Sequence, residues 1–159
     1  MEYHNINPVY DKDSKILILG SFPSVKSRET KFFYGHPQNR FWKVISALTG
    51  TSLPQTVEDK RKMLINNNIA VWDVIASCDI EGSSDSSIKN VVVNNLSEIL
   101  KETNIKTIFL NGGTAYNLFK KYNKDIDIDI IKLPSTSPAN ARYSLNMLID
   151  DWKIVRDKL

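Results

Sequence analysis

Short apolar runs alternate with longer amphipathic stretches along this chain. Four runs predict strands, at residues 15–19, 69–75, 107–110 and 127–133. The first three are mainly apolar, which is typical of strands buried on both faces of a sheet. The fourth alternates Asp and Ile, as a half-exposed edge strand does. Five stretches repeat apolar side chains at helical spacing, and these predicted helices are 39–49, 56–67, 95–103, 114–122 and 142–159.

The order of these elements predicts the fold class. One strand and two helices are followed by three strands, each leading into a helix. Strands that alternate with helices favour a parallel sheet covered by helices on both faces. We therefore expect an α/β fold, a three-layer αβα sandwich with a central four-stranded, mostly parallel sheet. Its 159 residues are expected to form a single domain, residues 1–159.

A polar segment follows each predicted strand. The first, residues 20–42, is far longer than the usual 2–6 residues of such connections and contains the aromatic run Phe32, Phe33 and Tyr34. The others include the serine-rich stretch 82–87, Asn111 with two glycines, and residues 134–140. Parallel sheets place their sites at the carboxyl ends of the strands. These four segments therefore predict one site at one edge of the sheet.

Composition narrows the chemistry of that site. A net charge of +3 is compatible with a polyanionic partner. One cysteine, Cys78, excludes an internal disulfide and a cysteine-based zinc site, and two histidines leave little for any metal. We expect no metal and no cofactor, since dinucleotide and P-loop fingerprints are also missing. The polar start of the chain and the absence of an 18-residue apolar run predict a cytoplasmic protein with no membrane partner.

Aromatic and neutral polar residues around a basic loop suit a flipped nucleic-acid base. Tyr34 can stack on a base, although it can equally be a core tyrosine. Asn111 can offer a donor and an acceptor to a base edge, although a turn or cap role is the simpler reading. Ser135, Thr136 and Ser137 can hold a phosphate at the start of the last helix, or merely cap that helix.

Two further residues suggest other chemistry. His36 with Ser21 or Ser137 would make an acyl hydrolase, but a loop histidine that bonds to the backbone is the favoured interpretation. Asp73, at the end of the second predicted strand, could be an acid or base, but a cap for the following turn is favoured.

Four blocks of this sequence, taken in order, resemble the uracil-DNA glycosylase superfamily. They are G-S-F-P-S with Y-G-H-P-Q-N-R-F-W-K, then G-S-S-D-S-S-I, then F-L-N-G, and last L-P-S-T-S-P-A-N-A. The resemblance spans residues 15–142. It is closest to the hypoxanthine-DNA glycosylase branch, and next to the mismatch-specific uracil/thymine enzymes, which share the H-P-x-N-R-F-W-K run.

The resemblance implies roles for individual residues. Phe22 stands where many relatives have a polar water-activating residue, and in the hypoxanthine branch that duty is assigned to the Asn of H-P-x-N, which makes Asn39 the catalytic, water-holding residue. The substrate-binding positions are Gly20, Ser21, Phe22, Tyr34 and Asn111, with Tyr34 stacking on the base and Asn111 reading its edge. The DNA-binding positions are Ser137, Pro138, Asn140 and Arg142, with Asn140, Arg142 and Tyr143 as alternative wedges. The basic loop residues Lys26, Arg28, Lys31 and Arg40 would contact phosphates.

These roles predict a monomeric, monofunctional DNA glycosylase. It would hydrolyse the N-glycosidic bond of a deaminated base in DNA, above all hypoxanthine, and leave an abasic site. A site without a carboxylate would act by positioning and by donors to the departing base. A mismatch-specific uracil or xanthine glycosylase and a non-catalytic nucleic-acid-binding module of the same fold are the alternatives.

Overall fold

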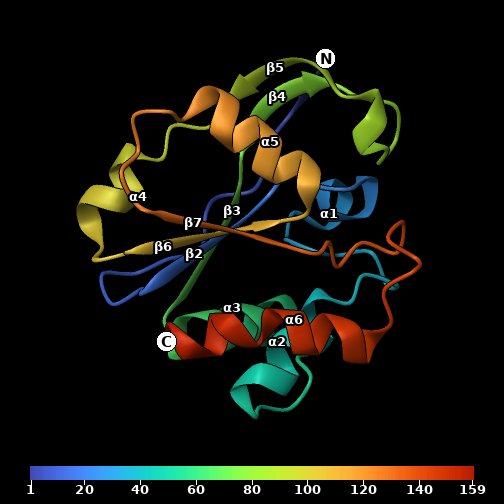
Figure 1. The fold of residues 1–159 in the computed structure, drawn as a ribbon. Helices are drawn as coiled ribbons and strands as arrows, with labels where there is room; N and C mark the ends of the chain where they lie inside the picture. Colours follow the sequence, from blue (N-terminus) through green and yellow to red (C-terminus); the bar gives the residue numbers. More distant parts are fainter.

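A four-stranded parallel sheet forms the centre of the computed structural model, which describes residues 1–159 (Figure 1). Its strands, in spatial order, are β3 (Ile69–Asp73), β2 (Ile16–Gly20), β6 (Thr107–Asn111) and β7 (Asp129–Leu133). The register places Gly20 opposite Asp73, and Leu19 opposite Leu110. The predicted α/β class and its four parallel strands are confirmed.

Apolar side chains on both faces of β2 explain why its sequence shows no alternation. Ile16 and Ile18 pack into one core, while Leu17 and Leu19 pack into a second core on the opposite face. All four are fully buried. A strand covered on both sides reads as a continuous apolar run because neither set of alternating positions reaches water.

Helices cover both faces of this sheet (Figure 1). The first core is covered by α2 (Phe41–Thr49), α3 (Val57–Asn66) and α6 (Leu145–Asp157), and the second by α4 (Ser97–Glu102) and α5 (Gly113–Tyr122). The last helix begins three residues later than predicted, because the Ser144 side chain accepts a hydrogen bond from the Met147 N–H and caps it there. No helix has the length and apolar character needed to cross a bilayer.

A second, antiparallel sheet was not predicted. It consists of β1 (Glu2–Tyr3), β4 (Ile75–Asp79) and β5 (Lys89–Val93), in the order β1-β4-β5. The apolar run 69–75 was interpreted as one strand, but it divides at Val74, whose N–H donates to the Gly20 carbonyl. Two other short elements were also missed, α1 (Val25–Thr30) and the 3-10 turn η1 (Asp85–Ser87).

Candidate active site

A cavity of about 730 Å³ opens at the carboxyl ends of β2, β3 and β6. This is the edge at which the sequence predicted a site, and the volume is in the usual range for ligand pockets. The predicted residues that line it are Gly20, Ser21, Phe22, Tyr34, Asn39, Asn111, Ser137, Pro138, Asn140 and Arg142. Lys26 and Arg28 are not among the lining residues. Segments as far apart in the sequence as Gly20 and Arg142 therefore meet at one cavity.

Three strand-end residues form its floor. These residues are Gly20, Asp73 and Asn111. Each lies two positions after a side chain that packs into the first core, namely Ile18, Val71 and Phe109. Since residues two apart on a strand point to the same face, all three lie on that side of the sheet. A Cβ at Gly20 would lie 2.5 Å from Asp73 Oδ1 and 3.2 Å from Tyr34 Oη. Glycine is therefore required here, because any side chain would fill the space between these polar groups.

Tyr34 is fixed as one wall of the cavity. Its ring stacks on Phe41, with centroids 3.9 Å apart and planes 15° from parallel, and its carbonyl accepts a 3.2 Å hydrogen bond from Trp42 Nε1. Its φ of 51° is rare for an aromatic residue. The Oη atom is sealed from solvent and has no hydrogen-bond partner. Burial, with the Asp73 carboxylate adding, raises the pKa of Tyr34, so the phenol keeps its proton.

Asn111 holds the residue that begins the opposite wall. Its Nδ2 donates to Thr136 Oγ1, and its Oδ1 accepts from the Thr136 backbone N–H, both at 3.0 Å. Since a backbone N–H can only donate, the orientation of the Asn111 amide is fixed. One Nδ2 hydrogen and one Oδ1 lone pair are left for a ligand.

Arg40 organises the whole of that wall, residues 135–143, here named the 135–143 loop. Its guanidinium donates to the carbonyl oxygens of Thr136 at 3.4 Å, Ser137 at 2.8 Å, Asn140 at 3.1 Å, and Tyr143. Its backbone N–H donates to Thr136 O as well, at 3.1 Å. Sequence reasoning gave Arg40 a phosphate contact, but its donors are already used in fixing the loop.

The wall on the other side is the serine loop, residues 82–87. Arg28 donates to Gly82 O at 2.7 Å, pairs with Glu2 at 3.3 Å and lies over the Phe22 ring at 5.4 Å. Its side chain is 15% exposed, so it is placed to hold this loop. Lys26 is half exposed and lies 4.0 Å from Glu29. The Ser83 hydroxyl accepts from the Val25 N–H at 2.9 Å.

Two carboxylates in the cavity contradict the expectation of a carboxylate-free site. Asp85 of the serine loop accepts a 3.0 Å hydrogen bond from Ser21 Oγ. Asp85 is exposed as a residue, but desolvation of its carboxyl raises the pKa, as does the nearby Asp73, while hydrogen bonds from Ser21 and Thr114 act in the opposite direction. Asp73 was interpreted as a turn cap. Its Oδ2 instead lies 2.8 Å from Nε2 of His4, a residue that sequence reasoning did not single out.

Asn39 and His36 lie on the cavity at the start of α2. Asn39 Oδ1 accepts a 2.9 Å hydrogen bond from the Phe41 N–H, which leaves its Nδ2 and one lone pair free to face a ligand. His36 Nδ1 accepts from the Gln38 N–H at 3.1 Å, as the favoured interpretation of a backbone-bonding histidine predicted. His36 forms no hydrogen bond with Ser21 or Ser137, so the hydrolase alternative gains no support.

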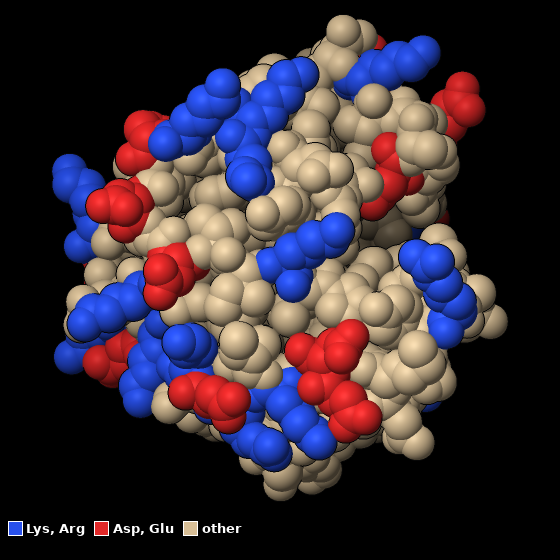
Figure 2. Space-filling view, viewed as in Figure 1, with Lys and Arg blue, Asp and Glu red and all other residues tan.

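The three proposed wedges differ in their freedom to move. Asn140 Nδ2 is tied to Ser135 O at 3.0 Å, and Tyr143 packs against the first core. Arg142 is exposed and lies at the cavity rim, as does Lys132, which sequence reasoning missed. Figure 2 shows acidic and basic side chains interspersed over the face it views, rather than one continuous basic patch.

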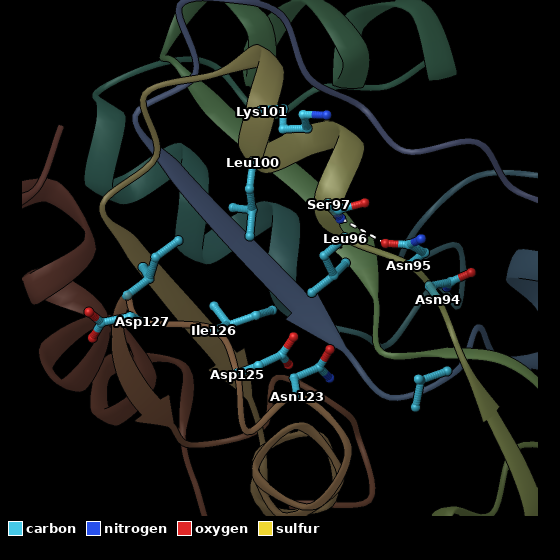
Figure 3. A pocket seen from close by; sticks show the side chains of 12 residues that line it. Asn94, Asn95, Leu96, Ser97, Leu100, Lys101, Asn123, Asp125, Ile126 and Asp127 are labelled. Atoms are coloured by element: carbon cyan, nitrogen blue, oxygen red, sulfur yellow. Dashed lines mark hydrogen bonds between the residues drawn. The ribbon is translucent and has the colours of Figure 1, made fainter.

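A second cavity, of about 530 Å³, lies between α4 and the segment that follows α5 (Figure 3). Leu96, Leu100 and Ile126 turn toward its interior, and Asn123 and Asp125 stand at its edge. The Asn123 Nδ2 atom is buried without a partner. None of the residues that the sequence assigned to a site lines this cavity.

Comparison with known proteins identifies the family of this chain. Residues 8–157 match the model of the uracil DNA glycosylase superfamily. Two curated proteins named hypoxanthine DNA glycosylase are similar over nearly their whole length. The one from Methanosarcina acetivorans is 35% identical over 150 residues, 92% of this chain and 93% of that protein. The one from Methanosarcina barkeri is 36% identical over 155 residues, 96% of each.

A solved structure gives the same result for the fold. The solution NMR structure of a uracil DNA glycosylase candidate from Methanosarcina acetivorans superposes with a TM-score of 0.82 at 33% identity. The match covers 95% of this chain and 94% of that one. With a family model that matches nearly every residue and relatives above 30% identity over the full length, the chain belongs to the uracil DNA glycosylase superfamily.

Proposed function

We propose that this protein is a monofunctional DNA glycosylase that hydrolyses the N-glycosidic bond of hypoxanthine in DNA. The observation that carries the proposal is the single cavity in which Tyr34, Asn39, Asn111 and Ser137 meet. The names of the two Methanosarcina relatives supply the substrate. The product would be an abasic site and the free base.

The cavity offers the groups that such a reaction needs. A flipped base would stack against Tyr34 and present its edge to the floor, where Asn111 has one amide hydrogen and one lone pair left. Asn39, whose Oδ1 also caps α2, would hold the attacking water. Bond cleavage passes through an oxocarbenium-like sugar while negative charge develops on the base, so fixed donors at the base edge lower the barrier.

The rim would take the DNA backbone. Ser137, Pro138 and Asn140 belong to the 135–143 loop, whose shape Arg40 fixes. Arg142 is the wedge candidate that we favour, because it is exposed while the Asn140 side chain is tied to the loop. Lys26 remains a phosphate contact in this proposal, since its side chain is 50% exposed. We infer action as a monomer, since one chain supplies the whole cavity.

Excision from defined oligonucleotides tests the proposal. Duplexes with a single deoxyinosine, deoxyuridine or deoxyxanthosine are incubated with the protein, and abasic sites are then cleaved by alkali. We expect fastest excision of hypoxanthine, with strand cleavage only after alkali, as a glycosylase without a lyase step requires. Faster release of uracil or xanthine would favour the mismatch-type alternative. DNA binding without release of any base would favour the non-catalytic module and overturn the proposal.

Asn39→Ala tests the catalytic assignment. We expect loss of excision by about 10²–10³-fold, the usual effect of removing a positioned polar group, with deoxyinosine DNA still bound. Asn146→Ala, at an exposed position of α6, is the matched control and should keep the wild-type rate. If Asn39→Ala stays within a few-fold of wild type while Asp85→Asn is inactive, the water is held by the Asp85 carboxylate and Asn39 is only a helix cap.

A further inference from the structure

A histidine and an aspartate form a buried pair at the floor of the cavity. His4 Nε2 and Asp73 Oδ2 are 2.8 Å apart, and their side chains are only 3% and 5% exposed. The imidazole is enclosed by Phe22, Phe33 and Trp72, each with its ring centroid within about 6 Å. His4 follows β1, whereas Asp73 ends β3, so the pair joins the small antiparallel sheet to the central one.

The hydrogen bonds of His4 determine which group donates. His4 Nδ1 accepts from the Ile6 backbone N–H at 3.2 Å, and a backbone N–H cannot accept. The imidazole proton is therefore on Nε2 and is donated to Asp73 Oδ2. This arrangement fixes the carboxylate by one of its two oxygens.

The other oxygen, Asp73 Oδ1, faces the cavity. No hydrogen bond in the structure uses it, and it is not among the unpartnered atoms that are sealed from solvent. It lies beside Gly20, the one floor position without a side chain, and Asp73 lines the cavity. Asn111 stands on the other side of Gly20, at the end of the neighbouring strand.

We propose that Asp73 Oδ1 accepts the N1–H of hypoxanthine and so selects deaminated bases, with His4 as the residue that positions it. This inference rests on the proposed function and deepens it. Deamination of adenine turns N1 from an acceptor into an N–H donor, and deamination of cytosine does the same at N3. A carboxylate oxygen can only accept, so it pairs with the deaminated base and opposes the lone pair of adenine or cytosine.

Asp73 suits this role better than its neighbours do. The Asn111 amide is already bound to Thr136 through both ends, and Asp85 lies on the serine loop rather than at a strand end. Sites that hydrogen-bond a substrate N–H reject analogues lacking it by large factors, since a buried polar group would be left unpaired. A fixed acceptor therefore gives more selectivity than a close fit alone.

Asp73→Asn is the decisive variant because His4 dictates how the new amide must lie. The Nε2–H of His4 needs an acceptor, so the amide oxygen takes the place of Oδ2 and the NH₂ group faces the cavity. The site then offers a donor where it offered an acceptor. We expect kcat/KM for deoxyinosine to fall by about 100-fold or more, and the ratio of deoxyadenosine to deoxyinosine excision to rise.

A modified substrate tests the same contact without any variant. In 1-deaza-2′-deoxyinosine a C–H replaces N1–H. The kcat/KM of the wild-type protein should therefore be about 100-fold lower on this substrate than on deoxyinosine, whereas the kcat/KM of Asp73→Asn should differ little between the two substrates. Asp151→Asn, an exposed carboxylate on α6, is the control and should behave as wild type. Thermal unfolding of Asp73→Asn checks that the isosteric variant is folded.

The outcomes separate this inference from the proposed function. If the wild type excises hypoxanthine but Asp73→Asn stays within about three-fold of it, or discriminates N1–H from C–H equally well, the role of Asp73 is overturned and the function stands. If the wild type excises nothing, calorimetric binding of free hypoxanthine and free adenine decides. A preference for hypoxanthine that Asp73→Asn abolishes keeps the inference, and equal binding overturns it.

Discussion

The two walls of the cavity are held in place in different ways. The 135–143 loop is held mainly by one side chain, Arg40, which donates to the carbonyl oxygens of four of its residues, while Asn111 adds two bonds to Thr136. The serine loop is held by several separate contacts, from Ser21 to Asp85, from Arg28 to Gly82, and from Val25 to Ser83. Four bonds to one wall thus come from a single guanidinium, whereas the bonds to the other wall come from several separate residues.

This difference teaches where the site can tolerate change. Hydrogen bonds from a charged donor contribute about 1.5–3 kcal/mol each, against about 0.5–1.5 kcal/mol for a neutral pair. Several hydrogen bonds of the charged, stronger kind come from one residue, Arg40, in the first wall, so a single substitution removes them together. In the second wall, each substitution removes one contact and leaves the others. Substitutions in the two walls should therefore differ in how much they lower excision and stability.

The largest effect is expected for Arg40→Lys. A lysine keeps the charge but cannot reach four carbonyl oxygens, because it lacks the planar fork of the guanidinium. We expect excision of hypoxanthine to fall by about 10²–10³-fold, and the free energy of unfolding to fall by about 2–4 kcal/mol. Single-turnover excision and urea denaturation measure the two effects. A lysine variant with the wild-type rate would show that the loop keeps its shape without the fork.

A smaller effect is expected for Arg28→Lys in the other wall. The variant loses the bond to Gly82 O and weakens the pair with Glu2, whose side chain is 53% exposed. Because Ser21 and Ser83 still hold the loop, we expect about a ten-fold fall in excision and about 1 kcal/mol in stability. The same two assays apply. Equal losses for Arg28→Lys and Arg40→Lys would contradict the contrast between the walls.

The smallest effect concerns Asp85 and is visible only as a function of pH. Its folded-state pKa is raised from the ordinary 3.8, so across the interval between the two values the folded protein retains a proton that the unfolded chain has lost. Stability falls as pH rises through that interval, and ionised Asp85 carries the penalty at neutral pH. Asp85→Asn should raise the Tm slightly at pH 7, with the gain vanishing as the pH approaches 3.8. A Tm difference that does not change between pH 7 and pH 4 would disprove this linkage.

The sequence predicted the central sheet because three of its strands are apolar runs of the right length and the fourth begins by alternating Asp and Ile. The antiparallel sheet escaped because β1 has two residues, and because the only apolar residues of β5 are three successive valines that are not buried and do not alternate with polar residues. Pairing between β1 and β4 joins residues more than 70 positions apart. Nothing local in the chain encodes such a contact, whereas burial on both faces is encoded residue by residue.

The site shows the same division. Gly20, Tyr34, Asn39 and Asn111 were predicted together, and all line one cavity. Arg40 was misjudged because its partners are backbone carbonyl oxygens, which every sequence contains. Asp73 was misjudged because its partner, His4, is 69 residues away. The available signal was its position: a carboxylate at the end of a buried strand, where the neighbouring strand ends in glycine.

Because His4 lies so near the start of the sequence, proteolytic removal of the first few residues would also remove the partner of Asp73. The residues before Ile6 add no apolar side chain to either core, but β1 pairs with β4 and the His4 imidazole is buried among aromatic rings of both cores. Trimming them would remove one strand of the small sheet and free the carboxylate of Asp73 from its support. With the role proposed above for Asp73, a clipped product would choose among bases less faithfully, so the intact mass of a preparation matters as much as its purity.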